Sequence, residues 1–537
     1  MAVWSATYQV RDFAQYVLEF KAFDSDGKVL RTTKVTPSTW RIRGQAAKRV
    51  RLEYSVLADR PGPFGAYADE DLVNLNLAQV LIYPAEGVDA AFSLDLINRP
   101  ANFKEALELP LCRRGYCAPD YATLVDTPVH LADFEATQYE VDGKRVRVVA
   151  SGAPGRFDLD LLESTTRRIV EAGAELMGEL PFERYTFVYV FSDGDGGGME
   201  YRNGTVIFGP ADCRTCGMPA LSAHEFFHLW NVKRIRPESM EPVDFSRPNP
   251  SPSLWFAEGV TSTYAQYLQI RAGLMAGTDL ISHLEQLIND YETRPAARLQ
   301  SAEDSSVEAW LERYPAYSRG DRSVSYYLKG ELIGHLLDLA IRHHSENLNS
   351  LDDAMRRLNE KGGLFGDSHE LATLTSELGR ADFEPIFEQL VRTPAAIPWA
   401  DYLGYAGLQL VSEQREQTAS GMTLANPAGL GMVVAEVLPG GPAEKAGFRR
   451  GDRLVRIEGR RVSGAAYEIG RRIGRSSGKA TEITIERRGL FHTLRLRPRK
   501  VTSTQYRIVD REQVSTAQRR VREGWLTRTT DSAAPSL

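Results

Sequence analysis

The spacing of apolar residues changes twice along this 537-residue chain, and the changes divide it into three blocks. Residues 1–130 hold short alternating or β-branched stretches, such as 49–56 and 79–83, separated by Gly, Pro and Asp turns. Residues 131–400 hold long stretches at helical spacing, and residues 401–500 return to short strands. This order predicts a multidomain chain with a β-rich N-terminal domain, an α+β middle domain and an α+β C-terminal domain.

The elements expected after residue 130 can be stated by range. In the middle block a strand is expected at 185–191, and helices at 159–179, 221–234, 254–272, 278–292, 323–344 and 350–360. In the last block strands are expected at 432–438, 453–458 and 481–487, and a short helix at 465–475. The composition of residues 501–537 predicts a disordered tail.

The composition excludes several classes of protein. The formal net charge is −6, from 65 Lys and Arg against 71 Asp and Glu, which gives no reason to expect a nucleic-acid partner. Hydrophobic residues make up 42% and charged residues 25%, as in ordinary globular proteins. No apolar run approaches the ~18 residues that a membrane-spanning helix needs. We therefore expect a soluble protein without a membrane span.

The four cysteines fall in two close pairs, Cys112/Cys117 and Cys213/Cys216. Three interpretations stay open: two local disulfides in an exported protein, free thiols in a cytosolic one, or a four-thiolate zinc site. No signal peptide follows Met1, so the chain as given points to the cytoplasm. A missing N-terminal segment would instead point to the periplasm or to export.

The stretch that says most about chemistry is His224-Glu225-Phe226-Phe227-His228. Side chains four residues apart lie on one face of a helix, so both imidazoles can reach one metal ion. The Glu between them is offset around the helix, where it can take a proton from metal-activated water. The alternative is two ordinary core or surface histidines on an amphipathic helix.

A third ligand would favour the metal site, and the segment 254–262 offers one. It places Glu258 among apolar residues at the start of a helical stretch. A carboxylate is costly to bury there unless it is paired or bound to a metal, and a catalytic zinc takes three protein ligands. We therefore predict one zinc ion per chain, held by His224, His228 and Glu258. The alternative is that Glu258 is an ordinary exposed residue of a helix.

Together these residues resemble a known family. His-Glu-x-x-His with a distal Glu in Trp-Phe-x-Glu-Gly-x-Thr is similar to the gluzincins, zinc peptidases with a thermolysin-like core. The run 227–237, Phe-His-Leu-Trp-Asn-Val-Lys-Arg-Ile-Arg-Pro, narrows the resemblance to the glycyl-aminopeptidase-like family with a C-terminal PDZ domain. Further matching segments are 4–5, 8–14, 126–129, 197–200 and 325–330. The expected parts are an N-terminal β domain at 1–130, a zinc peptidase domain at 131–400, a PDZ domain at 401–500 and a tail at 501–537.

The resemblance implies roles for two further residues. Tyr327, in Tyr-x-Lys-Gly, matches a phenol that stabilises the oxyanion in related aminopeptidases, although Tyr326 could serve instead or Tyr327 could only pack. Glu200, in Gly-Gly-Met-Glu, matches a carboxylate that binds the free α-amine of the substrate; the alternative is a solvated Glu at a loop end. Asn231 and Thr261 each follow a predicted ligand by one helical turn and could orient it or simply pack.

The PDZ expectation rests on the segments 429–434 and 439–458. PDZ domains bind an extended peptide by strand addition beside a helix, and backbone N–H groups capture the terminal carboxylate. The predicted peptide-binding loop is Gly429, Leu430, Gly431 and Met432. Residues 441–500 hold 17 Lys and Arg against 6 Asp and Glu, which suits acidic chain ends or is simply a solvated charged face.

The start of the chain departs from the family. Ala6-Thr7 stand where Pro-Gly is usual, and relatives carry additional strands before this point. We therefore expect an incomplete N-terminal β domain, through either a mis-set start or a real shortening, and an unaffected zinc site.

The predicted function is that of a zinc aminopeptidase that removes small residues, such as Gly or Ala, from peptides with a free N-terminus. One alternative is a zinc endopeptidase, which would also cut peptides with blocked N-termini. The other is a non-catalytic adaptor whose PDZ domain binds the C-termini of peptides or proteins. The joint presence of His224, Glu225, His228 and Glu258 favours the enzyme.

Overall fold

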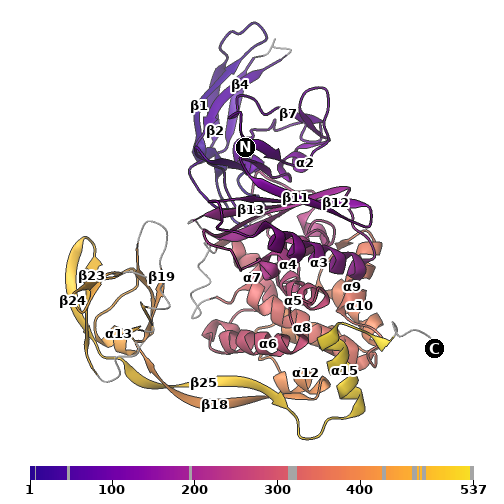
Figure 1. Cartoon of the computed structure of the whole chain (residues 1–537), viewed down its shortest axis with the longest axis vertical. Coiled ribbons are helices and arrows are strands. Elements are labelled where there is room, and N and C mark those ends of the chain that lie inside the picture. The colour runs from indigo at the N-terminus through magenta and orange to yellow at the C-terminus, as the bar shows by residue number, and fades with distance from the viewer. Residues whose placement is uncertain are drawn as a thin grey trace.

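The structure is a computed structural model that describes residues 1–5, 8–44, 49–192, 196–311, 323–425, 431–438, 440–462, 469–470, 472–473 and 479–531. Figure 1 shows a β-rich N-terminal part at one end, a helical body below it and a small β domain to one side. Two long strands, β18 (Leu408–Ala419) and β25 (Arg499–Asp510), connect the small domain to the body. The predicted multidomain fold class is confirmed.

The N-terminal part is built from small antiparallel sheets. The strands pair as β1–β4, β2–β3, β7–β9 and β5-β6-β10-β8. Their bounds are β1 Val17–Phe23, β2 Arg31–Thr36, β3 Thr39–Arg43, β4 Arg51–Val56, β5 Tyr67–Ala68, β6 Leu72–Leu75, β7 Phe92–Leu94, β8 Lys104–Ala106, β9 Tyr116–Ala118 and β10 Val129–Ala132, with a short helix α2 at Tyr121–Val125. The strand predicted at 49–56 is β4.

The prediction of a strand at 79–83 is wrong, because a helical turn, α1 (Leu77–Val80), occupies the start of this stretch. The side chain of Asn76 caps this turn by accepting a hydrogen bond from the Ala78 N–H at 3.1 Å. Gln79 is buried and its Oε1 accepts from the Ala66 N–H at 2.9 Å. These local side-chain bonds stabilise a turn where the alternation of residues suggested a strand.

A five-stranded sheet joins the N-terminal part to the body. Its order is β11-β12-β13-β15-β14, and only the two outer strands run antiparallel to their neighbours. The bounds are β11 Glu135–Val141, β12 Lys144–Ser151, β13 Arg184–Ser192, β14 Gly197–Tyr201 and β15 Gly204–Pro210. One face packs on α3 (Leu159–Met177) and the helical core, and the other on residues of the N-terminal part. β14 is therefore an edge strand of a sheet that is covered on both faces.

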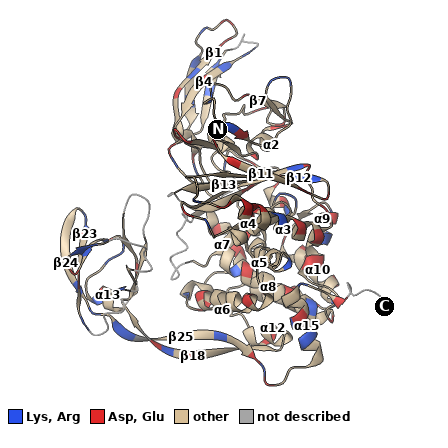
Figure 2. Cartoon of the chain, viewed as in Figure 1, with Lys and Arg blue, Asp and Glu red and all other residues tan. Residues whose placement is uncertain are grey.

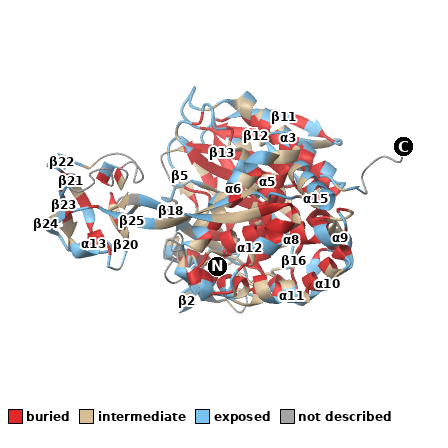
Figure 3. Cartoon of the chain, turned by 90° about the horizontal axis from the view of Figure 1, so that it is seen from below, coloured by how far each residue is buried: buried red, intermediate tan, exposed pale blue. Residues whose placement is uncertain are grey.

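The helical body contains every helix predicted for the middle block, but the one expected at 221–234 ends at Phe227. Its elements are α4 Pro219–Phe227, η3 Trp255–Val260, α5 Thr261–Arg271, α6 Gly277–Glu292, α7 Ala302–Glu308, α8 Tyr326–His344, α9 Leu351–Glu360, α10 Ser368–Gly379, α11 Glu384–Phe387 and α12 Trp399–Tyr405. Figure 3 shows that buried residues concentrate along α5 and α8, at the centre of the body. Among the described residues, no helix has the length and apolarity to cross a membrane.

The small domain has a sheet and a core of its own. The bounds are β19 Met422–Ala425, β20 Val433–Val437, α13 Pro442–Lys445, β21 Arg453–Ile457, β22 Arg460–Arg461, β23 Thr481–Arg487 and β24 Leu490–Leu496. Its core includes Met432, Phe448 and Ile483. The three predicted strands are present, and the helix predicted at 465–475 lies largely outside the described residues.

The prediction of a disordered tail at 501–537 is wrong for the described part, which ends at residue 531. β25 pairs with β18 in twelve antiparallel positions, and α15 (Thr516–Thr527) then packs on the body. Trp525 is fully buried, and its Nε1 donates to the Tyr267 hydroxyl at 3.2 Å. The prediction from composition failed because a short, mostly polar helix can pack on the body through a single stripe of apolar residues.

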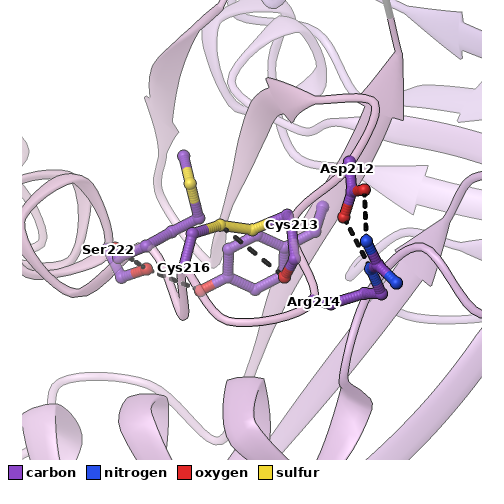
Figure 4. Close-up of a disulfide and its surroundings, with 7 residues drawn as sticks. Asp212, Cys213, Arg214, Cys216 and Ser222 are labelled. Atoms are coloured by element: carbon purple, nitrogen blue, oxygen red, sulfur yellow. Dashed lines mark hydrogen bonds and ion pairs between the residues drawn. A yellow bond between two sulfur atoms is a disulfide. The ribbon is translucent and has the colours of Figure 1, made fainter.

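The cysteines form two local disulfides, Cys112–Cys117 and Cys213–Cys216, which excludes the free thiols and the four-thiolate site. The second disulfide lies in the loop between β15 and α4 (Figure 4). Beside it, Ser222 of α4 donates a hydrogen bond to the carbonyl oxygen of Met218 at 2.7 Å. The loop that leads into α4 is therefore held by covalent and polar contacts.

Arg528, directly after α15, is buried in the body between two acids. Its Nη1 lies 2.6 Å from Asp338 Oδ2 and its Nη2 lies 3.2 Å from Asp352 Oδ1. The guanidinium also stacks on the ring of Tyr267, 3.4 Å from its centroid. Removing one partner of a buried ion pair leaves the other charge uncompensated, which is costly.

We therefore expect Arg528→Met to destabilise the body by about 3–5 kcal/mol, because Asp338 and Asp352 lose a buried cation. The matched control is Arg522→Met on α15. Its ion pair with the exposed Asp510 should contribute less than ~1 kcal/mol to the free energy of unfolding. Thermal and denaturant unfolding of the three proteins measures the difference. An Arg528→Met protein as stable as the control variant would contradict this account.

Candidate metal centre and active site

The predicted catalytic residues meet in a cavity of about 460 Å³. Its lining comes from β14, from α4, η3, α5 and α8, and from Arg11 and Phe64 of the N-terminal part. The lining includes His224, Glu225, His228, Glu258, Glu200 and Tyr327. Segments far apart in the sequence thus build one site.

The side chains of His224, His228 and Glu258 converge. The two Nε2 atoms lie 3.1 Å apart, and Glu258 Oε2 lies 3.4 Å from that of His224 and 3.2 Å from that of His228. A tetrahedral zinc ion with bonds of about 2.0–2.1 Å holds its ligands about 3.3 Å from one another. The three residues therefore fit a zinc ion.

Hydrogen bonds set the orientation of both imidazoles. His228 Nδ1 lies 2.8 Å from the carbonyl oxygen of Asn231, which can only accept, so Nδ1 donates to it and Nε2 faces the centre of the site. His224 Nδ1 lies 3.4 Å from Ser262 Oγ, which donates its own proton to the Glu258 carbonyl oxygen at 3.1 Å. Each imidazole thus presents Nε2 to the centre of the site.

Asn231 also connects the two ligand-bearing segments through its side chain. Its Nδ2 donates to the Phe256 carbonyl oxygen at 2.8 Å and to Thr261 Oγ1 at 3.1 Å. Thr261 Oγ1 donates to the Ala257 carbonyl oxygen at 2.7 Å. Asn231 therefore contacts a predicted ligand directly, whereas Thr261 acts one hydrogen bond further away.

Glu258 lies in η3, a single π-helical turn of a kind that is frequent at functional sites. The turn crosses α8 at two glycines. A Cβ atom on Gly259 would lie 2.4 Å from the Cα of Gly330, and one on Gly330 would lie 2.2 Å from the carbonyl oxygen of Trp255. Only glycine permits this approach, which brings Tyr327 of α8 to the cavity.

Glu225 is buried against β14. A Cβ atom on Gly198 would lie 2.2 Å from Glu225 Oε1, so the glycine leaves the space that the carboxylate occupies. Burial raises the pKa of Glu225 well above its usual range, and the nearby Glu200 adds to the rise against the opposing effect of His228. A raised pKa suits a group that accepts a proton and returns it.

Glu200 lies in β14 and is buried, so the alternative of a solvated loop residue is wrong. Its Oε1 accepts no hydrogen bond from the described residues and lies 3.8 Å from Lys233 Nζ. Lys233 in turn pairs with Asp126 at 2.8 Å. Burial raises the pKa of Glu200, and the Lys233 ammonium opposes that rise.

Tyr327 lines the cavity, with its ring centroid 6.2 Å from that of His224. Tyr326 is buried in the core and does not line the cavity, so the phenol at the site belongs to Tyr327. One turn further along α8, Glu331 also lines the cavity and pairs with His283 at 2.7 Å. The only signal of Glu331 in the sequence is its place directly after the Tyr-x-Lys-Gly motif.

The charges of the ligands are mutually dependent. Burial alone would lower the pKa of His228, but the facing Glu258 carboxylate raises it to about 10. Burial alone would raise the pKa of Glu258, but the two histidines hold it below its usual range. Burial lowers the pKa of His224. The site therefore holds an ionised carboxylate that attracts a cation.

Family models match three segments of the chain. The M61 peptidase N-terminal domain matches residues 1–133, the M61 glycyl aminopeptidase matches residues 218–333, and a PDZ domain matches residues 433–487. The chain carries the domains of the M61 glycyl aminopeptidase family. The resemblance seen in the sequence is thus confirmed, and the chain is a zinc aminopeptidase by class, a hydrolase of peptide bonds.

One solved structure shares the fold over nearly the whole chain. The crystal structure of an aminopeptidase N family protein from Idiomarina loihiensis matches with a TM-score of 0.83 at 22% identity, over 98% of this chain and 94% of that one. An M1 zinc metallopeptidase from Deinococcus radiodurans matches with a TM-score of 0.43 at 14% identity, over 71% and 85%. A mutant of that metallopeptidase bound to a Tyr-Ser-Ala substrate matches with a TM-score of 0.45 at 15% identity, over 71% of this chain and 85% of that one. No curated protein matches the chain.

Two of the four residues of the predicted peptide-binding loop lie among the described residues of the small domain. Gly429 and Leu430 lie outside the described residues, and Gly431 and Met432 lead into β20. β20 is paired with β19 on one side and with β21 on the other, whereas β19 is an edge strand of the described sheet. Among the described strands, the sheet thus has free edges at β19 and at β24, and not at β20.

The contact between Gly198 and Glu225 gives a test. We expect Gly198→Ala to lower turnover by about tenfold to a hundredfold, because a catalytic group displaced by ~1 Å loses that much rate. Zinc content should not change, since no predicted ligand is affected. The control is Gly366→Ala, outside the cavity, whose added Cβ would lie 3.5 Å from Glu370 Oε2. Equal rates in both variants would rule out a constraint on Glu225 by Gly198.

Proposed function

We propose that this chain cleaves the first peptide bond of peptides that have a free N-terminus, with a preference for small first residues such as Gly or Ala. The observation that carries the proposal is the buried Glu200 carboxylate, which lies within 4.8 Å of the ligand atoms of Glu225 and His228. A fixed carboxylate at this distance from the reacting groups suits an α-ammonium. The preference for Gly or Ala rests on the description of the matching family.

His224, His228 and Glu258 would hold one zinc ion per chain. When bound, zinc supplies a Lewis acid that polarises the scissile carbonyl and lowers the pKa of water. Glu225 would accept a proton from the attacking water and pass it to the leaving amine. Tyr327 would donate its phenol O–H to the oxyanion that develops on the scissile carbonyl.

The edge strand β14 offers a place for the substrate backbone. Residues 196–200 line the cavity, and the described sheet has no further strand beyond β14. A peptide that adds here as an antiparallel strand would place its α-ammonium at Glu200 and its first peptide bond near Glu225. Main-chain hydrogen bonds of this kind do not depend on the side chains of the substrate.

The PDZ domain would bind C-termini of peptides or proteins by strand addition at β19. Ser420 and the left-handed Gly421 precede this strand, and the Met422 N–H donates to Ser420 Oγ at 3.3 Å. Figure 2 shows Lys and Arg along the ribbon next to this domain, where they would attract acidic chain ends.

The two alternatives make different predictions. An endopeptidase would cut peptides with acetylated N-termini as well as free ones, and a non-catalytic adaptor would cut neither. Exclusive cleavage of free N-termini supports the aminopeptidase.

The roles of Glu225 and His224 can be separated by metal analysis. Glu225→Gln should retain one zinc ion per chain and lose several orders of magnitude in turnover, because the residue is a base and not a ligand. His224→Ala should lose both zinc and activity, since two protein ligands hold zinc poorly. The control is Glu171→Gln on the exposed side of α3, which should match the wild type in both measurements. Loss of zinc from Glu225→Gln would mean that the roles are misassigned.

The role of Glu200 is tested with Gly- and Ala-anilides, free and N-acetylated. A charge-assisted hydrogen bond is worth about 1.5–3 kcal/mol, so the wild type should prefer free substrates by at least about 10- to 150-fold. Glu200→Ala should remove most of this preference in kcat/KM and leave zinc in place. An unchanged ratio would exclude the amine anchor and favour an endopeptidase.

A further inference from the structure

Lys233 places a largely buried ammonium directly beside the proposed amine anchor. Its side chain is 11% exposed, and its Nζ lies 3.8 Å from Glu200 Oε1 and 2.8 Å from Asp126 Oδ1. Burying an ammonium is costly unless carboxylates pair with it, and here two of them do. Glu200 lines the active-site cavity, whereas Lys233 and Asp126 are not among the described residues that line it. The charge of Lys233 therefore acts on the active site through Glu200.

The backbone beside Lys233 is strained. Val232, which precedes it, has a φ of 137°, in a region that β-branched residues rarely adopt. The Lys233 N–H donates to the carbonyl oxygen of the predicted ligand His228 at 3.1 Å. Strained conformations persist only where the surrounding contacts enforce them, and they cluster at active sites. The position of Lys233 is therefore enforced by the structure around the metal-binding helix.

Three separate parts of the chain meet at this ammonium. Asp126 directly follows α2 in the N-terminal part, Glu200 lies in the edge strand β14, and Lys233 lies in the loop after α4. Two carboxylates around one ammonium leave the group with one negative charge. Without Asp126, the charge of Lys233 would cancel that of Glu200 and repel the ammonium of a substrate. The N-terminal part thus supplies a charge that the site needs in order to attract an amine.

We propose that Lys233 and Asp126 are positioning residues for the amine anchor. Lys233 fixes the Glu200 carboxylate, and Asp126 balances the charge of Lys233, so that the group keeps a net negative charge for the α-ammonium of the substrate. This inference rests on the proposed amine-anchoring role of Glu200. Neither residue touches the substrate, and both act through Glu200. The N-terminal β domain is therefore part of the amine-recognition site, through Asp126.

The test measures kcat and KM for Gly-anilide, and kcat/KM for N-acetyl-Gly-anilide, with the Asp126→Asn protein. We expect KM for the free substrate to rise about 10- to 150-fold, the worth of a charge-assisted hydrogen bond, with little change in kcat. The acetylated substrate has no ammonium and should be cut as by the wild type, and zinc content should not change. The control is Asp133→Asn, which removes an exposed carboxylate of the same part of the chain that pairs with Lys104.

Variants at Lys233 give a second measurement. Lys233→Met removes the ammonium, so the ratio of kcat/KM for free over acetylated substrate should fall, whereas Lys233→Arg retains a cation and should keep part of the ratio. The control is Lys144→Met, whose ammonium pairs with the exposed Glu183. An unchanged ratio in Asp126→Asn would overturn the proposal. An equal loss of kcat/KM on both substrates would also overturn it, because that result indicates a purely structural role. If Lys233→Met does not fold, Asp126→Asn and Lys233→Arg decide.

A double-mutant cycle separates failure of this proposal from failure of the proposed function. Because Asp126 acts only through Glu200, Asp126→Asn should not change the ratio further in a Glu200→Ala background, and an additive loss there would contradict the proposal. If Glu200→Ala itself keeps the wild-type ratio, the amine anchor is wrong. If Glu200→Ala removes the ratio and Asp126→Asn keeps it, the anchor stands and the role of Lys233 and Asp126 is overturned.

Discussion

The arrangement of the active site depends on burying three carboxylates, Glu200, Glu225 and Glu258, in one small cavity. Like charges in such a place repel one another and lose hydration, so each requires its own compensation. Glu258 faces two histidines, and Glu200 has the Lys233–Asp126 pair behind it. Glu225 forms no ion pair with any described residue, and burial raises its pKa. The three glutamates therefore differ in their charged neighbours and in the shifts of their pKa values.

The cavity is rigid because aromatic and ionic contacts support the helices beneath it. Phe227, inside the His-Glu-x-x-His motif, stacks on Tyr264 with ring centroids 4.1 Å apart. The Tyr264 hydroxyl donates to Asp352 at 3.0 Å, and Asp352 pairs with Arg528. A continuous series of contacts therefore runs from the metal-binding helix to the last described helix of the chain. The end of the chain is thus part of the body that carries the site.

Local spacing made the core of the site predictable from sequence. Two histidines four apart require a helix if they share a metal, and an acid among apolar residues requires a partner, so His224, His228 and Glu258 could be named together. Arg11, Lys233 and Glu331 could not be assigned, because their positions depend on contacts between distant segments rather than on a pattern. The π turn at Glu258 and the crossing at Gly259 and Gly330 also follow from tertiary packing. Composition failed at residues 501–531, where one buried tryptophan outweighs many polar neighbours.

The two-stranded ribbon has a consequence for how this protein can change. Ala419 and Arg499 face each other as the last pair of β18 and β25, and the whole small domain lies between them in the sequence. Antiparallel ends at this spacing can be closed by a two-residue turn. The peptide-binding module is therefore a cassette within the chain, which recombination could remove or exchange while the hydrolytic body keeps both of its own ends. Recognition and catalysis can then evolve at independent rates.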